Sequence, residues 1–247
     1  MFEFALAFNS AVHCWDTSKV TSFEKMFEEA YLFDQEVGDW DTSSATTFRS
    51  MFEDARVFNQ TVGDWDTSSV TNMYEMFEGA FLFNQPLGDW NTWNVTDFDS
   101  MFKYAHSFNQ TVGDWDTSSV TNFRSMFQGA LVFNQTVADW DTSYGWTMGF
   151  MFDGASSFNQ NCSDWDVGQV LEFPSMFKNA TSFNQDLNNW NVINAQDMNE
   201  MFADATSFNQ SLYKWDAPGL FYCTDFAKGA LCGPDCGLPT YVAKCED

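Results

Sequence analysis

Tryptophan recurs every 25 residues along this chain, and that interval constrains the fold more than any other feature. Nine of the 11 tryptophans keep it, and only Trp93 and Trp146 fall outside it. A Met-Phe pair, an alanine and a second phenylalanine keep the same interval without insertion or deletion. Such repeats stack, because one unit alone cannot bury its apolar side chains. The regular tryptophans are Trp15, Trp40, Trp65, Trp90, Trp115, Trp140, Trp165, Trp190 and Trp215.

Two patterns inside one repeat predict its secondary structure. Met73, Met76, Phe77 and Ala80 fall at i, i+3, i+4 and i+7, which is one face of a short helix. Residues 62–67 alternate apolar and polar side chains, as a short strand does. We therefore predict an α/β solenoid of the leucine-rich-repeat type, a right-handed superhelix with one short strand and one short helical segment in each 25-residue coil.

The aromatic residues are expected to form the core of this stack. They make up 19% of the chain, and most of the phenylalanines occupy three repeated positions, those of Phe2, Phe8 and Phe23. Stacked repeats can bury such residues by laying each ring on its counterpart in the next coil. We therefore interpret these aromatic side chains as core and not as a platform for a ligand.

The repeat also carries a family resemblance. The segment from Val70 to Phe98, VTNMYEMFEGAFLFNQPLGDWNTWNVTDF, resembles the BspA-type leucine-rich-repeat surface proteins. It is most similar to a 25-residue branch of unknown function found in mycoplasma and other bacterial lipoproteins and in microalgae. The resemblance covers about residues 1–220. It implies a curved solenoid, a location on or outside the cell, a role in adhesion or recognition, and no enzyme activity.

The charge of the chain restricts its partners. It carries 35 acidic and 10 basic residues, a net charge of −25. Nucleic acid is excluded as a partner, since binding its phosphates requires a basic surface. No apolar segment is long enough for membrane insertion. We expect a protein partner, with basic proteins among the candidates, or self-assembly.

Cysteines crowd the C-terminal end and suggest a separate cap. We predict two domains, a nine-coil solenoid over residues 1–220 and a disulfide-rich cap over residues 221–247. Two disulfides would place the protein in an oxidising compartment, whereas a four-thiolate zinc site fits the spacing poorly. The sequence leaves the pairing open. The four cysteines are Cys223, Cys232, Cys236 and Cys245. Cys162 replaces a core valine and is expected to be a buried thiol.

The expected location is extracellular or at the cell surface. The chain has no secretory signal and begins at the Met-Phe position of a repeat, so we expect that a signal, a cap or further repeats preceded Met1. Among the Asn-x-Ser/Thr sequences, those in the repeated Phe-Asn-Gln motif are interpreted as a structural asparagine ladder. Asn94 and Asn179 are the predicted glycosylation sites.

The acidic residues beside the tryptophans are the candidate functional site. A strand with tryptophan inward places both flanking carboxylates on the opposite, concave face. We predict that this acidic face contacts the partner. The residues predicted there are Asp39, Asp41, Asp64, Asp66, Asp89, Asp114, Asp116, Asp139, Asp141, Asp164 and Asp166, of which Asp39, Asp41, Asp64, Asp66, Asp114, Asp116, Asp139 and Asp141 are the candidate calcium ligands.

A ladder of carboxylates on adjacent coils repels itself, and three features can offset this repulsion. At a spacing of about 4.8 Å, each pair costs about 0.9 kcal/mol even in bulk water. Neighbouring hydroxyl and backbone N–H groups can hydrogen-bond the carboxylates. Calcium favours clustered carboxylate oxygens. A basic partner is the third candidate. Columns of threonine also leave open ice binding by a flat array.

Catalysis is not expected. The chain has two histidines and lacks a phosphate-binding loop, a nucleophile elbow and a metal-binding histidine motif. An acid–base pair needs two carboxyl groups with different pKa values, and a repeated array supplies many equivalent ones. We therefore expect a protein for adhesion, recognition or assembly through its acidic concave face. The alternative is a purely structural subunit of a larger filament or complex.

Overall fold

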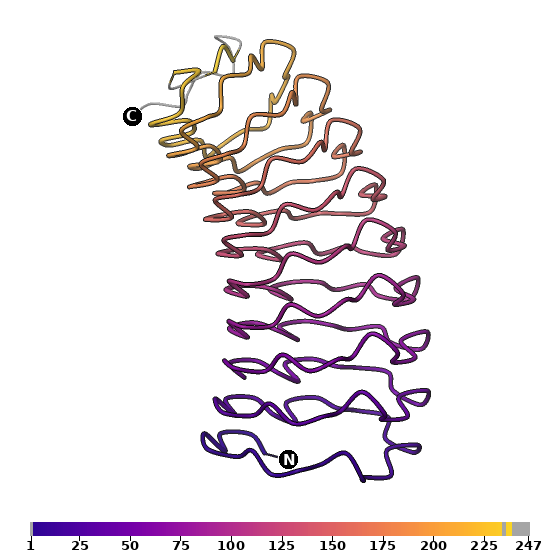
Figure 1. The fold of residues 1–247 in the computed structure, drawn as a ribbon. Coiled ribbons are helices and arrows are strands. Elements are labelled where there is room, and N and C mark those ends of the chain that lie inside the picture. The colour runs from indigo at the N-terminus through magenta and orange to yellow at the C-terminus, as the bar shows by residue number, and fades with distance from the viewer. Residues whose placement is uncertain (1, 234–235, 239–247) are drawn as a thin grey trace.

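The computed structural model describes residues 2–233 and 236–238. Each 25-residue repeat forms one coil, and the coils stack from the N-terminal to the C-terminal end in a column that bends toward its C-terminal end (Figure 1). Eight parallel bridges, each of a single residue pair, join successive coils. The bridged residues are Ser22, Thr47, Asn72, Asp97, Asn122, Thr147, Glu172, Asp197 and Tyr222. The repeat register of the sequence is therefore the register of the stack.

The predicted helical and strand segments are wrong. Over the residues described, the chain forms neither a helix nor a strand longer than one bridged residue, so no helix there is long and apolar enough to cross a membrane. Each coil is instead a run of tight turns. The fold is thus a stack of turn-built coils and not an α/β solenoid of the leucine-rich-repeat type.

Backbone hydrogen bonds between coils explain why the helix does not form. The amides of Met73, Glu75 and Phe77 donate to carbonyl oxygens of the next coil at 3.2, 3.0 and 2.9 Å, 24 residues further along the chain. In a helix these amides would bond within their own segment. The coil lacks those internal bonds and instead bonds to its neighbour along one side of the stack, which we call a wall.

Left-handed residues produce this arrangement. Glu75 and Gly79 have φ values of 55° and 67°, and each coil repeats the pair. A residue with positive φ every fourth position breaks a right-handed helix into turns and points alternate amides at the next coil. The residues with positive φ in this segment are Lys25, Glu29, Ser50, Asp54, Glu75, Gly79, Ser100, Tyr104, Ser125, Gly129, Phe150, Gly154, Ser175, Asn179, Glu200, Asp204, Asp225 and Gly229.

The predicted strand over residues 62–67 is replaced by a turn. The Trp65 amide donates to the Val62 carbonyl at 3.3 Å, three residues back. The alternation of side chains nevertheless holds, with Trp65 buried and Asp64 and Asp66 exposed. A turn with one inward side chain produces the same short pattern as a strand, so the pattern alone cannot separate the two.

The aromatic core is confirmed. Phe27 lies 5.7 Å from Phe52 of the next coil between ring centroids, and the two planes differ by 10°. Within one coil, Phe27 and Phe33 stack at 3.8 Å. Trp40 and Trp65 lie parallel at 6.4 Å. These contacts repeat through the stack, so each coil buries its rings on those of its neighbours.

Side chains join the coils where the backbone does not. The indole nitrogen of Trp65 donates to the Val37 carbonyl of the preceding coil at 3.0 Å, and each tryptophan of the series from Trp40 to Trp215 makes the equivalent bond. At another corner, the side-chain oxygen of Asn59 accepts from the Asn84 amide at 2.9 Å. The predicted asparagine ladder therefore bonds backbone, although Asn59 itself is exposed.

The C-terminal coils contain the disulfides. Cys232 and Cys236 are bonded to each other, and Cys223 is also disulfide-bonded. Cys245 lies outside the described residues. The backbone bonds of the wall continue to Lys228, beyond the predicted domain boundary at residue 220. Cys162 is a buried free thiol, as expected.

A glycine substitution distinguishes turns from a helix. Gly154 has a φ of 71°, and a Cβ there meets no atom closer than 3.7 Å. The Gly154→Ala variant should lose about 1 kcal/mol of unfolding free energy, because a side chain disfavours the left-handed conformation. In a helix interior the same change would stabilise the protein by about 0.5–1 kcal/mol. Gly219→Ala, without positive φ or close contacts, is the control in urea unfolding and should show no loss.

Candidate functional site

The predicted acidic residues lie at the surface in two columns. The first contains Asp39, Asp64, Asp89, Asp114, Asp139 and Asp164, and the second contains Asp41, Asp66, Asp116, Asp141 and Asp166. All are exposed, as the sequence predicts. They flank the buried tryptophans but do not stand on a strand.

The carboxylates of the second column accept hydrogen bonds from residues nearby in sequence. Oδ1 of Asp66 accepts from the Ser68 amide at 3.0 Å and from the Ser68 hydroxyl at 2.6 Å. The serine hydroxyl, followed by its amide, lowers the pKa of Asp66. The same pair of bonds is present at Asp41 and Asp116, and Asp16 repeats it. Local hydrogen bonding, one of the three expected ways to offset repulsion, therefore operates in this column.

No converging metal ligands are found among the described residues. They contain no group of three or more His, Cys, Asp or Glu side chains that could hold a metal ion. Calcium binding by the columns stays a prediction from the sequence.

The two predicted glycosylation sites have their side-chain nitrogens occupied. Asn94 is half-buried, and its Nδ2 donates to the Ser68 carbonyl at 2.9 Å. Asn179 is exposed, and its Nδ2 donates to Oδ1 of Asp153 at 3.3 Å. A glycan on either residue would have to replace that bond, and modification of both stays a prediction.

A different surface, which sequence reasoning missed, brings varied chemistry together. We define the variable face as the side chains at positions 24, 25 and 28 and their equivalents every 25 residues. It covers the wall where backbone bonds join the coils. Because the backbone supplies those bonds, the side chains are free to differ from one coil to the next.

The composition of the variable face differs from that of the other walls. It carries six of the ten basic residues in a chain of net charge −25. Aromatic, acidic and hydroxyl side chains lie among them. By position, its residues are Glu24, Arg49, Tyr74, Asp99, Arg124, Gly149, Pro174, Asn199 and Thr224; Lys25, Ser50, Glu75, Ser100, Ser125, Phe150, Ser175, Glu200 and Asp225; and Glu28, Glu53, Glu78, Lys103, Gln128, Asp153, Lys178, Ala203 and Lys228.

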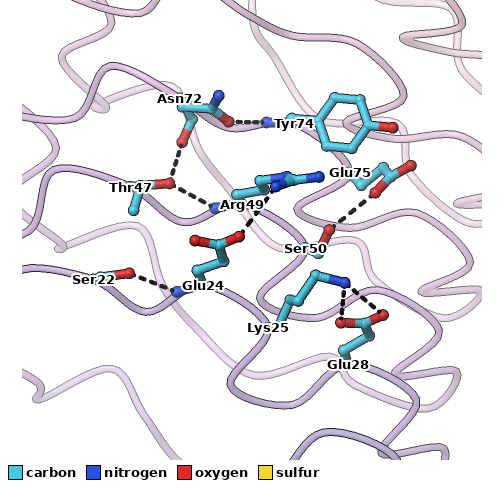
Figure 2. A network of polar contacts seen from close by, with 10 residues as sticks. All are labelled: Ser22, Glu24, Lys25, Glu28, Thr47, Arg49, Ser50, Asn72, Tyr74 and Glu75. Carbon is cyan, nitrogen blue, oxygen red and sulfur yellow. Dashed lines mark hydrogen bonds and ion pairs between the residues drawn. The ribbon is translucent and has the colours of Figure 1, made fainter. Parts of the chain in front are cut away.

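Polar contacts cross the coils on this face (Figure 2). Arg49 pairs with Glu24 of the preceding coil at 3.1 Å, and its guanidinium lies 5.1 Å from the centre of the Tyr74 ring of the next coil. The Ser50 hydroxyl donates to Glu75 at 3.0 Å. These contacts join side chains of three successive coils in one network.

A hollow of about 310 Å³ lies beside this network and shares Tyr74 and Glu75 with it. Both charge signs and two aromatic rings line it, and its accessible surface is mainly polar, so it offers chiefly ion pairs and hydrogen bonds. All nine lining residues belong to the variable face. They are Tyr74, Glu75, Asp99, Ser100, Lys103, Arg124, Ser125, Gln128 and Phe150.

Acidic residues crowd the N-terminal part of the variable face. Burial raises the pKa of Glu53 to about 7, and the carboxylate of Glu75 adds to the shift, followed by those of Glu28 and Glu78. A hydrogen bond from Ser50 acts in the opposite direction. Glu53 therefore titrates near neutral pH.

A comparison with known protein families finds one that matches the chain. The model of a family described as "Mycoplasma protein of unknown function, DUF285" matches residues 1–80, 58–145 and 138–229. The chain belongs to this family. The three DUF285 matches follow one another along the chain, in agreement with the tandem repeats. No curated protein matches the chain.

The sequence held a sign of the variable face. Residues that repeat without change drew attention to the tryptophans and aspartates, which the structure assigns to packing and turns. The variable face is recognised by the opposite property, the differences between equivalent positions such as Arg49, Tyr74 and Asp99.

The two aspartate columns should respond differently to substitution. The double variant Asp66→Ala and Asp116→Ala should lose about 1 kcal/mol of unfolding free energy or less per site, because each change removes two turn hydrogen bonds. The matched variant Asp64→Ala and Asp114→Ala should keep or raise stability, since it relieves like-charge repulsion. Urea unfolding measures both, and equal losses in the two variants would contradict the assignment.

Glu53 should give the protein a pH-dependent stability. A carboxyl whose folded pKa is raised from 4.5 to about 7 binds more protons folded than unfolded between these values, so stability falls as pH rises through that interval. The Glu53→Gln variant should melt at a higher temperature than the parent at pH 8 and at a similar one near pH 5. Exposed Glu36 supplies the control, Glu36→Gln, whose pH profile should follow the parent.

Proposed function

We propose that this protein is a recognition module that binds a protein partner through its variable face. The observation that carries the proposal is the hollow lined wholly by variable positions, with aromatic rings and both charge signs. Tyrosine, phenylalanine and arginine are enriched where proteins bind one another. Elsewhere in the coil, recurring tryptophan, asparagine and threonine side chains bond one coil to the next.

The charge distribution supports a partner with both charge signs. Arg124 lies 4.7 Å from the Phe150 ring centre, and Lys103 pairs with Glu78 at 2.8 Å. Such fixed charges select a complementary surface more than they add affinity. The net charge of −25 speeds the approach of a basic partner and repels polyanions.

A location at or outside the cell surface is part of the proposal. The Cys232–Cys236 disulfide supports it, because disulfides persist in oxidising compartments. The resemblance of the repeat to BspA-type surface proteins, in which adhesion and recognition are expected, supports it as well.

Selection from a random displayed-peptide library tests the proposal and separates the two candidate surfaces. Enriched peptides should lose binding to the triple variant Arg49→Ala, Tyr74→Ala and Arg124→Ala. They should keep binding to the control Asp39→Asn, Asp64→Asn and Asp114→Asn. Peptides that lose binding to the aspartate variant instead, or a library without enrichment, would count against the variable face.

A purely structural subunit of a larger filament or complex is the second candidate. Trp15 and Met26 help line a largely apolar hollow of about 490 Å³, which contact with another subunit would cover. Sedimentation velocity over a range of protein concentrations tests it. Association that the Met26→Gln variant reduces favours this role, and a single species at all concentrations argues against it.

A further inference from the structure

The two tryptophans outside the 25-residue interval are exposed. Trp93 and Trp146 have 52% and 47% of their surface accessible, and Tyr144, beside Trp146 in sequence, has 68%. The regular tryptophans from Trp40 to Trp215 are buried. The repeat thus explains the buried tryptophans through packing and leaves these three aromatic residues without a role in the core.

Trp146 replaces a residue that bonds the coils together. Equivalent threonines, such as Thr121, donate their hydroxyl to the preceding coil at 3.0–3.4 Å. Trp146 keeps the backbone bond of this position, from its amide to the Thr121 carbonyl at 3.0 Å, but has no hydroxyl to donate. The change costs the fold a hydrogen bond and exposes an indole.

The aromatic pair lines a hollow of about 520 Å³. Ser143, Tyr144, Trp146 and Gln169 form its walls, and none of them carries a charge. The hollow therefore combines two flat apolar rings with hydroxyl and amide groups. Its volume is in the range of small-ligand sites.

Trp93 lies on the same corner of the stack, two coils before Tyr144. Its indole nitrogen donates to the Ser68 carbonyl at 3.2 Å, which fixes the ring against the preceding coil. With parallel backbones about 4.8 Å apart, the backbone positions of Trp93 and Tyr144 are about 10 Å from each other along the axis. Trp93 is not part of the hollow's lining, so only an extended ligand that crosses the coils would reach it as well.

We propose that Trp93, Tyr144 and Trp146 form a binding site for a neutral oligosaccharide. A pyranose ring has an apolar C–H face, which stacks on an aromatic ring, and hydroxyl groups around its edge, which suit Ser143 and Gln169. It carries no charge, in agreement with the lining of the hollow. Sulfated or phosphorylated sugars are repelled by a chain of net charge −25.

A protein partner fits this corner less well. A stable protein interface buries about 800 Å² on each partner and concentrates its energy in desolvated anchors. Here the three aromatic residues are divided between coils that are two apart, and exposed Asp116 and Asp141 lie on the coils of the same corner. The site is separate from the variable face, so the two proposals can fail independently.

Substitutions that restore the repeat test the oligosaccharide site. The double variant Tyr144→Ser and Trp146→Thr introduces the residues of the equivalent positions Ser119 and Thr121, so the coil should fold as its neighbours do. Calorimetric titration with neutral glucose, mannose and galactose oligomers of increasing length should show binding by the parent and at least tenfold weaker binding by the double variant. The Trp93→Ser variant should bind long oligomers more weakly than the parent and bind short oligomers equally well.

Two controls make the result specific. The variable-face variant Arg49→Ala, Tyr74→Ala and Arg124→Ala should bind the sugar as the parent does, and a sulfated oligomer of equal length should bind more weakly. The proposal is overturned if no neutral oligomer binds at millimolar concentration, if the double variant binds as the parent does while melting at the same temperature, or if the sulfated oligomer binds equally well. Selected peptides that the double variant alone fails to bind would also overturn it, since they would assign the corner to a protein.

Discussion

The rest of this structure depends on how each coil is hydrogen-bonded to the next. A chain built from turns leaves many peptide groups without a partner inside their own segment, and buried groups of this kind must be paired. One wall solves this with backbone bonds, as between Met73 and Asp97. Elsewhere side chains add bonds between coils, namely the indole of tryptophan, the amide of asparagine and the hydroxyl of threonine.

Whether backbone or side-chain groups bond the coils at a given position determines how far the sequence can vary there. A side chain that bonds the next coil must keep its length and its donor or acceptor, so Trp65 and Asn59 recur with little change. On the wall joined by backbone bonds, side chains have no such duty, and Arg49, Tyr74 and Asp99 occupy equivalent places. Under the proposed function, recognition falls to a wall whose side-chain identities are not fixed by the backbone bonds that join its coils.

The sequence predicts the stack, its register and its core, because these follow from residues that recur at one interval. It also predicts correctly that tryptophan points inward and its flanking aspartates outward. It fails on secondary structure, since the spacing of Met73, Met76, Phe77 and Ala80 is shared by a helix and by turns with a left-handed residue at every fourth position. Glycines in one register, Gly79, Gly129 and Gly154, mark that backbone. The variable face was missed because attention to recurring residues passes over the positions that differ.

The tryptophan bond has a further consequence for the way the chain is made. Trp40 reaches back 28 residues to the Val12 carbonyl, and Trp65 reaches equally far to Val37. During synthesis, each new coil can therefore bond to the coil made just before it. It does not need a segment that is distant in sequence. The loop to be closed has the same length for every coil, so its entropic cost does not grow with the protein. Synthesis and folding can advance together, one coil at a time, whatever the final number of coils.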